Sequence, residues 1–67
     1  MTNEVTNFAK KLRQLRLKKK LSQGSVAEIL DVHRTYISGL ERGRRNPSLA
    51  TIQKLAKALK VSPKDFL

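Results

Sequence analysis

Apolar residues recur at intervals of three and four along nearly the whole of this chain, with no strand-like segment, internal repeat or low-complexity stretch between them. This spacing places an apolar stripe on one face of each predicted helix. Sixty-seven residues are enough for one domain, so we expect a single all-α domain of five short helices over residues 1–67. The expected helices are about Asn3–Lys18, Gln23–Leu30, His33–Arg42 and Leu49–Leu59, with a fifth beginning after Ser62.

The fifth helix is predicted from the stretch SPKDFL. Ser62 is a suitable N-cap, Pro63 occupies the first helical position, and Asp65 occupies the capping-box position. A helix that begins there places Phe66 and Leu67 either against the core or against a second subunit. A domain this small buries only about 60% of its unfolded surface, so dimerisation would bury useful additional apolar area.

The charge of the chain is strongly positive. Lys and Arg number 15 against 5 Asp and Glu, for a formal net charge of +10. Such a balance indicates a polyanionic partner, because neutralised phosphates release their condensed counterions and so drive binding. A merely soluble basic surface and an anionic membrane surface are the alternatives, and we favour a nucleic acid.

Other classes of function find little support in the residues. The chain has no cysteine and one histidine, His33, so we expect no metal site and no cofactor. It has no nucleophile–base pair and no Walker loop, so we do not expect an enzyme. No apolar run approaches the roughly 18 residues of a membrane span, and the first residues do not form a secretory signal. We therefore expect a cytoplasmic protein, without a separate domain for a small-molecule ligand.

Two predicted helices are joined by only about three residues, Leu30–Val32. A link this short makes the helices cross steeply, which is the geometry of a helix-turn-helix over about residues 22–42. In that motif the second helix enters the DNA major groove. With Ile37 and Leu40 facing inward, its outward face presents hydroxyls, arginines and a bare backbone. We predict contacts with bases or the groove from Arg34, Thr35, Tyr36, Ser38 and Gly39.

Phosphate contacts are predicted around that face. Arg42 and Arg44 suit phosphate anchoring, and Arg45 could also reach a base. Ser22 and Gln23 begin the second helix, where free amides and the helix dipole favour a phosphate.

Three residues of this region have a second interpretation. Gly39 costs about 1 kcal/mol in a helix interior, and either close approach to DNA or neutral drift on an exposed face accounts for it. Tyr36 either packs at the core edge with its hydroxyl in water or touches the sugar–phosphate backbone. Glu41 is a lone carboxylate among arginines, and we predict a partly buried ion pair with Arg16.

A family resemblance is carried by the ordered signals LSQ, VA, YISGLERG, PSL and LAKALKVS within about Leu12–Phe66. This part of the chain resembles the Cro and phage-repressor type of helix-turn-helix domain. The resemblance implies a compact, five-helix, lambda-repressor-like domain that binds operator DNA as a dimer. It also implies a salt bridge between Arg16 and Glu41 and a phosphate contact by Gln23.

Within that family, the stretch RTYISGLERGRRNPS is most similar to the controller proteins of restriction–modification systems. These are small dimers that regulate their own gene and the endonuclease gene. The similarity implies base or groove contacts by Arg34, Thr35, Tyr36 and Arg45, with phosphate contacts near Ser38 and Arg42.

Three positions depart from the family pattern. Gly24 stands where an acid is usual, which weakens the first turn of the second helix, and Asp31 stands where the turn usually has glycine. His33 replaces the usual serine, so we expect a poor cap there. His33 could instead reach a phosphate, more strongly when it is protonated.

The function expected from these observations is that of a sequence-specific transcriptional regulator. We predict a homodimeric controller of a restriction–modification operon that binds palindromic operator half-sites. A prophage or other small repressor of the same fold, and an antitoxin-like protein-interaction module, are the alternatives. Val61, Phe66 and Leu67 are assigned to the dimer interface, and an interaction module would use the same surface for another partner.

Overall fold

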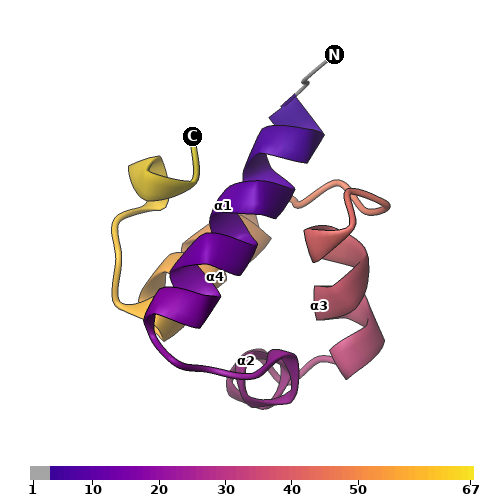
Figure 1. The fold of residues 1–67 in the computed structure, drawn as a ribbon, viewed down its shortest axis with the longest axis vertical. Helices are drawn as coiled ribbons and strands as arrows, with labels where there is room; N and C mark the ends of the chain where they lie inside the picture. Colours follow the sequence, from indigo (N-terminus) through magenta and orange to yellow (C-terminus); the bar gives the residue numbers. More distant parts are fainter. Residues whose placement is uncertain (1–3) are drawn as a thin grey trace.

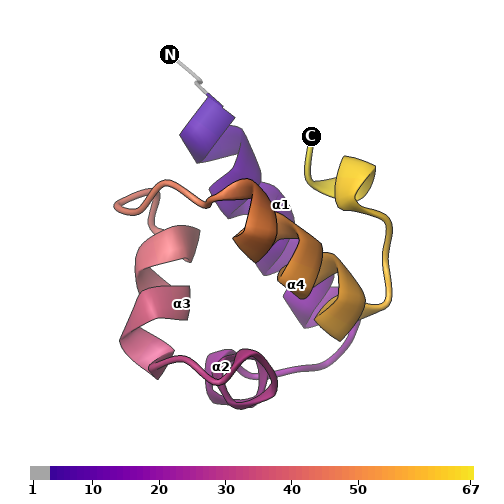
Figure 2. The same cartoon turned by 180° about the vertical axis from the view of Figure 1, so that it is seen from behind.

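The computed structural model describes residues 4–67, which form four α-helices and one 3₁₀ turn (Figures 1 and 2). The start expected at Asn3 lies outside the described residues. The third helix is one residue shorter at each end than expected, because its two end residues are caps. Within residues 4–67 no helix is long and apolar enough to cross a membrane. The elements are α1 (Glu4–Lys18), α2 (Gln23–Leu30), α3 (Arg34–Glu41), α4 (Leu49–Leu59) and the 3₁₀ turn η1 (Pro63–Phe66).

The expectation of five helices is wrong, because the segment after Ser62 forms one 3₁₀ turn and not an α-helix. The predicted start signal is present, since the Ser62 amide donates to Oδ2 of Asp65 at 2.9 Å. The amides of Asp65 and Leu67 then bond to carbonyls three residues back. A cap stabilises only a first turn, and an α-helix needs further turns of four-residue bonds to propagate.

The link between α2 and α3 reverses the chain within three residues. Asp31 adopts the left-handed conformation, with φ of 58°, and the Val32 amide donates to the Ala27 carbonyl at 2.9 Å. Figures 1 and 2 both present α2 end-on and α3 from the side, so the two helices cross steeply. α2 packs against both α3 and α4. This is the helix-turn-helix geometry that the short link predicts.

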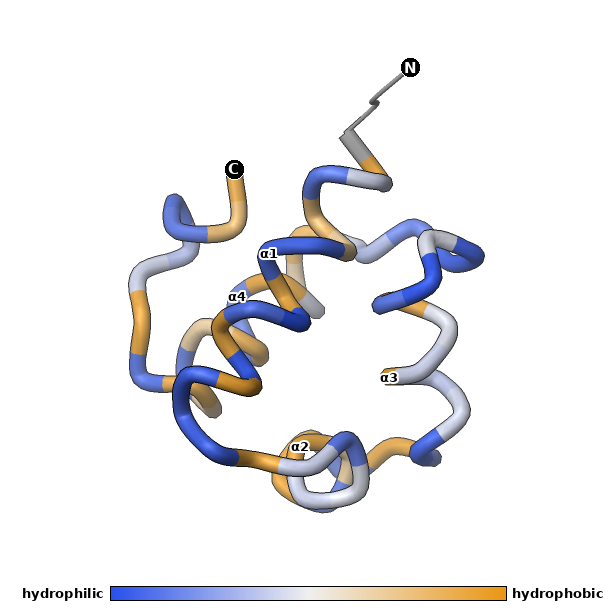
Figure 3. Tube along the Cα trace, in the orientation of Figure 1, coloured by the Kyte–Doolittle hydropathy of each residue, from blue (hydrophilic) through white to orange (hydrophobic). Residues whose placement is uncertain are grey.

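The core lies where the four helices and η1 meet. Phe66 is 1% exposed, and its ring centre lies 5.4 Å from that of Phe8 in α1. Of the two positions left open for Phe66, the structure has it in the core of its own chain, whereas Leu67 is 80% exposed. Figure 3 shows hydrophilic segments at the end of α1 and in the loop after α3. The largest fully buried side chains are Leu12, Val26, Ile37, Leu40, Leu55, Leu59 and Phe66.

Candidate nucleic-acid interface

The outward surface of α3 is polar, and its inward surface is fully buried. Ile37 and Leu40 are 0% exposed and hold the helix against the core. Arg34 and Thr35 in the first turn are exposed, and Ser38 is partly exposed one turn further along. The face therefore offers hydrogen-bond donors and acceptors along the length of the helix.

His33 caps α3, which corrects the expectation of a poor cap. Its Nδ1 accepts a hydrogen bond from the Thr35 amide at 3.2 Å and lies 2.9 Å from Oγ1 of Thr35. A ring nitrogen that accepts from an amide carries no proton, so the cap needs that atom unprotonated. The exposed imidazole thus holds both the backbone and the hydroxyl of Thr35 at the start of the helix.

Polar contacts connect the interior to the first turn of α3. Arg16 donates from Nε to Oε2 of Glu41 at 2.5 Å and from Nη2 to Oε1 at 2.9 Å. These are the residues for which an ion pair was predicted, and their side chains are 10% and 4% exposed. Gln23 donates from Nε2 to Oε1 of Glu41 at 3.1 Å, and its Oε1 accepts from Nη1 of Arg34 at 3.5 Å. Gln23 therefore turns its amide nitrogen inward and its oxygen toward Arg34.

The carboxylate of Glu41 favours the charged form of Arg16. The hydrogen bond to Glu41 raises the pKa of Arg16 above its ordinary value; burial opposes this rise, and attraction by the carboxylate adds to it. A raised pKa in the folded state stabilises the fold at lower pH, and that stability is lost only as the pH rises through the raised value. Nη1 of Arg16 also donates to the Leu21 carbonyl at 2.8 Å. The negative charge of Glu41 is balanced by Arg16 inside the fold, so it does not reduce the positive charge of the surface arginines.

Tyr36 is partly buried and packs at the edge of the core. Its hydroxyl lies 3.2 Å from Oγ1 of Thr51, which in turn lies 3.0 Å from Oγ of Ser48 at the start of α4. The ring thus has the core-edge position that was one of its two expected places. Thr51 was not predicted, although the Ser-x-x-Thr spacing at the start of a helix places the two hydroxyls close together.

Three arginines follow the outward face of α3. Arg42, Arg44 and Arg45 are exposed, and the chain reverses beside them at Gly43, whose φ is +73°. Across the part of the chain that the structure describes, neither these three side chains nor Arg34 forms an ion pair. Their positive charges are therefore available to a polyanion.

The start of α2 adjoins this surface through the contact between Gln23 and Arg34. Ser22 is the N-cap of α2, and its Oγ accepts from the Ser25 amide at 3.0 Å.

The residues assigned to a dimer interface lie elsewhere. Figure 1 shows η1 on the opposite side of α1 and α4 from α3, and η1 packs against both α1 and α4.

Known proteins match the chain over nearly its whole length. A family model described as helix-turn-helix matches residues 12–66. The control protein C.BamHI of Bacillus amyloliquefaciens is 54% identical over an alignment of 69 positions, which covers 100% of this chain and 85% of that protein. The crystal structure of the restriction–modification controller protein C.AhdI from Aeromonas hydrophila has a TM-score of 0.90 and 43% identity, and the match covers 94% of this chain and 96% of that one.

A further match is the crystal structure of the restriction–modification controller protein C.Esp1396I as a tetramer in complex with its natural 35 base-pair operator. It has a TM-score of 0.87 and 30% identity, and the match covers 98% of this chain and 87% of that one. The resemblance predicted from the sequence is confirmed: this chain belongs to the helix-turn-helix family, together with the controller proteins of restriction–modification systems.

Proposed function

We propose that this chain is a sequence-specific DNA-binding transcription regulator that controls the operon of a restriction–modification system. The observation that carries the proposal is the surface of α3, a helix that crosses α2 steeply and presents a polar face with unpaired arginines at both ends. Similarity to controller proteins, one of them solved with its operator, supports the more specific part. Such a regulator would act in the cytoplasm, at the nucleoid, and would need no catalytic group or cofactor.

In this proposal α3 lies in the major groove. Arg34 suits a guanine, because its guanidinium can donate two hydrogen bonds to O6 and N7. The oxygen of Gln23, 3.5 Å from Nη1 of Arg34, supports the guanidinium from the side of α2. Thr35, held by the cap of His33, adds a hydroxyl and a methyl group beside it. Ser38 and Arg45 are proposed to face the groove as well. Gly39 would approach it through its backbone, and Tyr36 would meet it from the edge of the core, with its hydroxyl beside Thr51.

Phosphates are proposed to meet the rim of the same surface. Arg42 and Arg44 are exposed and can donate pairs of hydrogen bonds to phosphate oxygens. At the other end of α3, the proposed phosphate contacts are Ser22, His33 and the main-chain amide of Gln23, whose side-chain nitrogen donates inward to Glu41. Contacts at both ends would hold the helix at one depth and orientation in the groove.

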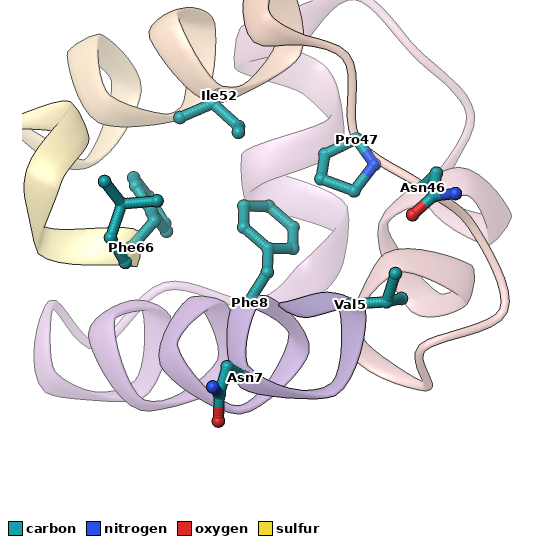
Figure 4. A pocket seen from close by; sticks show the side chains of 8 residues that line it. Val5, Asn7, Phe8, Asn46, Pro47, Ile52 and Phe66 are labelled. Atoms are coloured by element: carbon teal, nitrogen blue, oxygen red, sulfur yellow. The ribbon is translucent and has the colours of Figure 1, made fainter. Parts of the chain in front are cut away.

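We also propose that the protein acts as a homodimer through the surface around its last residues. A hollow of about 420 Å³ lies between α1, the loop before α4, and η1. Figure 4 shows the Phe8 ring between Phe66 and Pro47, with Ile52 above it. Leu67, 80% exposed, also lines this hollow, and Val61 is partly buried. Because Phe66 is buried, it would form the floor of such an interface, with Leu67 and Val61 at its surface.

Selection from a random duplex pool near physiological salt, followed by sequencing of the bound fraction, tests the proposal. We expect one enriched site with two symmetric halves about one helical turn apart, because a two-fold dimer presents its two α3 helices to successive major grooves. The same sequence should occur upstream of the protein's own gene. Tight binding without any enriched sequence would contradict the proposal and would favour a protein-interaction module with a basic surface.

A further inference from the structure

Gly39 lies in the middle of α3, directly beneath the side chain of Arg45. A Cβ atom placed on Gly39 would come 3.0 Å from Cγ of Arg45 and 3.8 Å from its Nε. The first of these distances is closer than an ordinary van der Waals contact. The aliphatic part of Arg45 therefore lies against Gly39, and any other residue at position 39 would require this side chain to shift by a few tenths of an ångström.

The backbone brings Arg45 back to the same residue. The chain turns at Gly43, and the Arg44 amide then donates to the Gly39 carbonyl at 2.9 Å. The residue that precedes Arg45 is thus bonded to Gly39 itself. The carbonyl of Gly39 thus binds the loop through the Arg44 amide. Because Gly39 has no Cβ, the Arg45 side chain can lie close to the helix backbone.

Backbone conformation does not explain this glycine. Gly43 is the one glycine in residues 4–67 that has a positive φ, so Gly39 has a conformation open to any residue. Glycine within a helix is less favourable than alanine. Gly24, the other helical glycine, differs, since a Cβ there would meet Ser22 Oγ at 3.8 Å and Arg34 Cδ at 3.9 Å, which are ordinary contacts. Space for Arg45 is therefore the particular feature of position 39.

We propose that Gly39 is a positioning residue that determines DNA specificity through Arg45. The absence of a side chain at position 39 lets Arg45 lie across α3 and present its guanidinium to a guanine. This inference rests on the proposed function and deepens it. Arg34 and Gly39 are five residues apart, which is about 7.5 Å along a helix that rises about 1.5 Å per residue, and successive base pairs are about 3.4 Å apart. Arg45 therefore reads a base position separate from that of Arg34.

The test compares four variants with the wild type: Gly39→Ala, Arg45→Ala, the double variant, and the matched control Gly24→Ala. Random-pool selection with Arg45→Ala identifies the base position whose preference depends on Arg45. Affinities are then measured on the selected operator and on duplexes changed at that position or at the position read by Arg34. Circular dichroism and thermal melting establish that each variant is folded.

We expect Gly39→Ala to melt no lower than the wild type, because alanine favours the helix. Its affinity for the operator should fall about tenfold, which is within the range for one bidentate guanine contact. The base preference should be lost at the operator position that Arg45 reads and kept at the operator position that Arg34 reads. Adding Gly39→Ala to Arg45→Ala should cause no further loss, and Gly24→Ala should keep the Arg45 preference.

Two results would overturn the inference. In the first, Gly39→Ala lowers operator affinity as much in the Arg45→Ala variant as in the wild type. That result would mean that the glycine allows close approach of the helix to DNA and does not act through Arg45. Unchanged preference in Gly39→Ala would mean that Arg45 needs no such space. Either result leaves the proposed function standing if the wild type selects an operator. A wild type without any sequence preference would overturn the proposed function, and this inference with it.

Discussion

At the scale of single residues, side chains near α3 contribute both to the fold and to the proposed DNA surface. The place of Gln23 at a helix start predicted only a phosphate contact. Its bond to Glu41, 18 residues away, depends on how α2 and α3 pack, and no local pattern reveals that. The ion pair of Arg16 with Glu41 could be anticipated, because a lone acid among arginines needs an internal partner.

The cap formed by His33 leads to a test of stability. His33→Ala removes the acceptor for the Thr35 amide, and we expect a loss of about 1 kcal/mol in the free energy of unfolding. For a domain of this size that is a drop of roughly 4–8 °C in melting temperature. His33→Ser restores a cap and should melt near the wild type. Equal melting of the alanine and serine variants would show that the imidazole does not cap the helix.

The buried ion pair leads to a larger effect. Glu41→Gln leaves Arg16, which is 8% exposed, without its carboxylate, and we expect a loss of roughly 3–5 kcal/mol. A small domain has little stability to spare, so much of the population should unfold. Urea denaturation measures the loss. Glu28→Gln, at an exposed position of α2, is the matched control and should stay within about 0.5 kcal/mol. Similar values for both variants would contradict the structural role of the pair.

At the scale of elements, the positions of α2, α3 and α4 could be predicted because spacing and caps act locally. The fifth element could not, since the signal at Ser62 specifies a first turn but not its continuation. The position of Arg45 against Gly39 could not be predicted from the sequence either, because it depends on a loop that folds back at Gly43. The sequence also left open whether Tyr36 and Phe66 pack against the core, because that depends on how the helices come together.

The turn between α2 and α3 provides a test at this scale. Asp31 has a φ of 58°, a conformation that costs roughly 1–2 kcal/mol for most L-residues and little for glycine. Asp31→Val should therefore lower the free energy of unfolding by about that amount, and Asp31→Gly should not lower it. Thermal melting of the two variants measures the difference. If Asp31→Val is as stable as the wild type, the turn does not require the left-handed conformation.

At the scale of the whole molecule, two surfaces on opposite sides would have different partners. The arginine-rich face of α3 suits DNA, and the apolar hollow around Phe8 and Ile52 suits a second copy of the chain. The net charge of +10 makes association with DNA sensitive to salt, because each neutralised phosphate releases counterions. The charge was evident in the sequence, but its distribution over the surface was not.

The proposed dimer can be tested at its exposed edge. Leu67→Ser removes an apolar side chain that is 80% exposed, so the fold should survive while self-association weakens. Leu49→Ser, at a position that is 70% exposed and outside the hollow, is the matched control. Sedimentation at micromolar concentration measures both. A wild type that stays monomeric, or equal association of the two variants, would remove Leu67 from the interface.

The most direct test of the central claim compares Arg34→Ala and Arg42→Ala on the selected operator and on a shuffled duplex of the same length. We predict that Arg34→Ala loses about 1–3 kcal/mol on the operator alone and relaxes the preference at one base position. Arg42→Ala should weaken binding to both duplexes alike. Equal losses on both duplexes for both variants would mean that α3 does not read bases, and the account of this protein as a sequence-specific regulator would be contradicted.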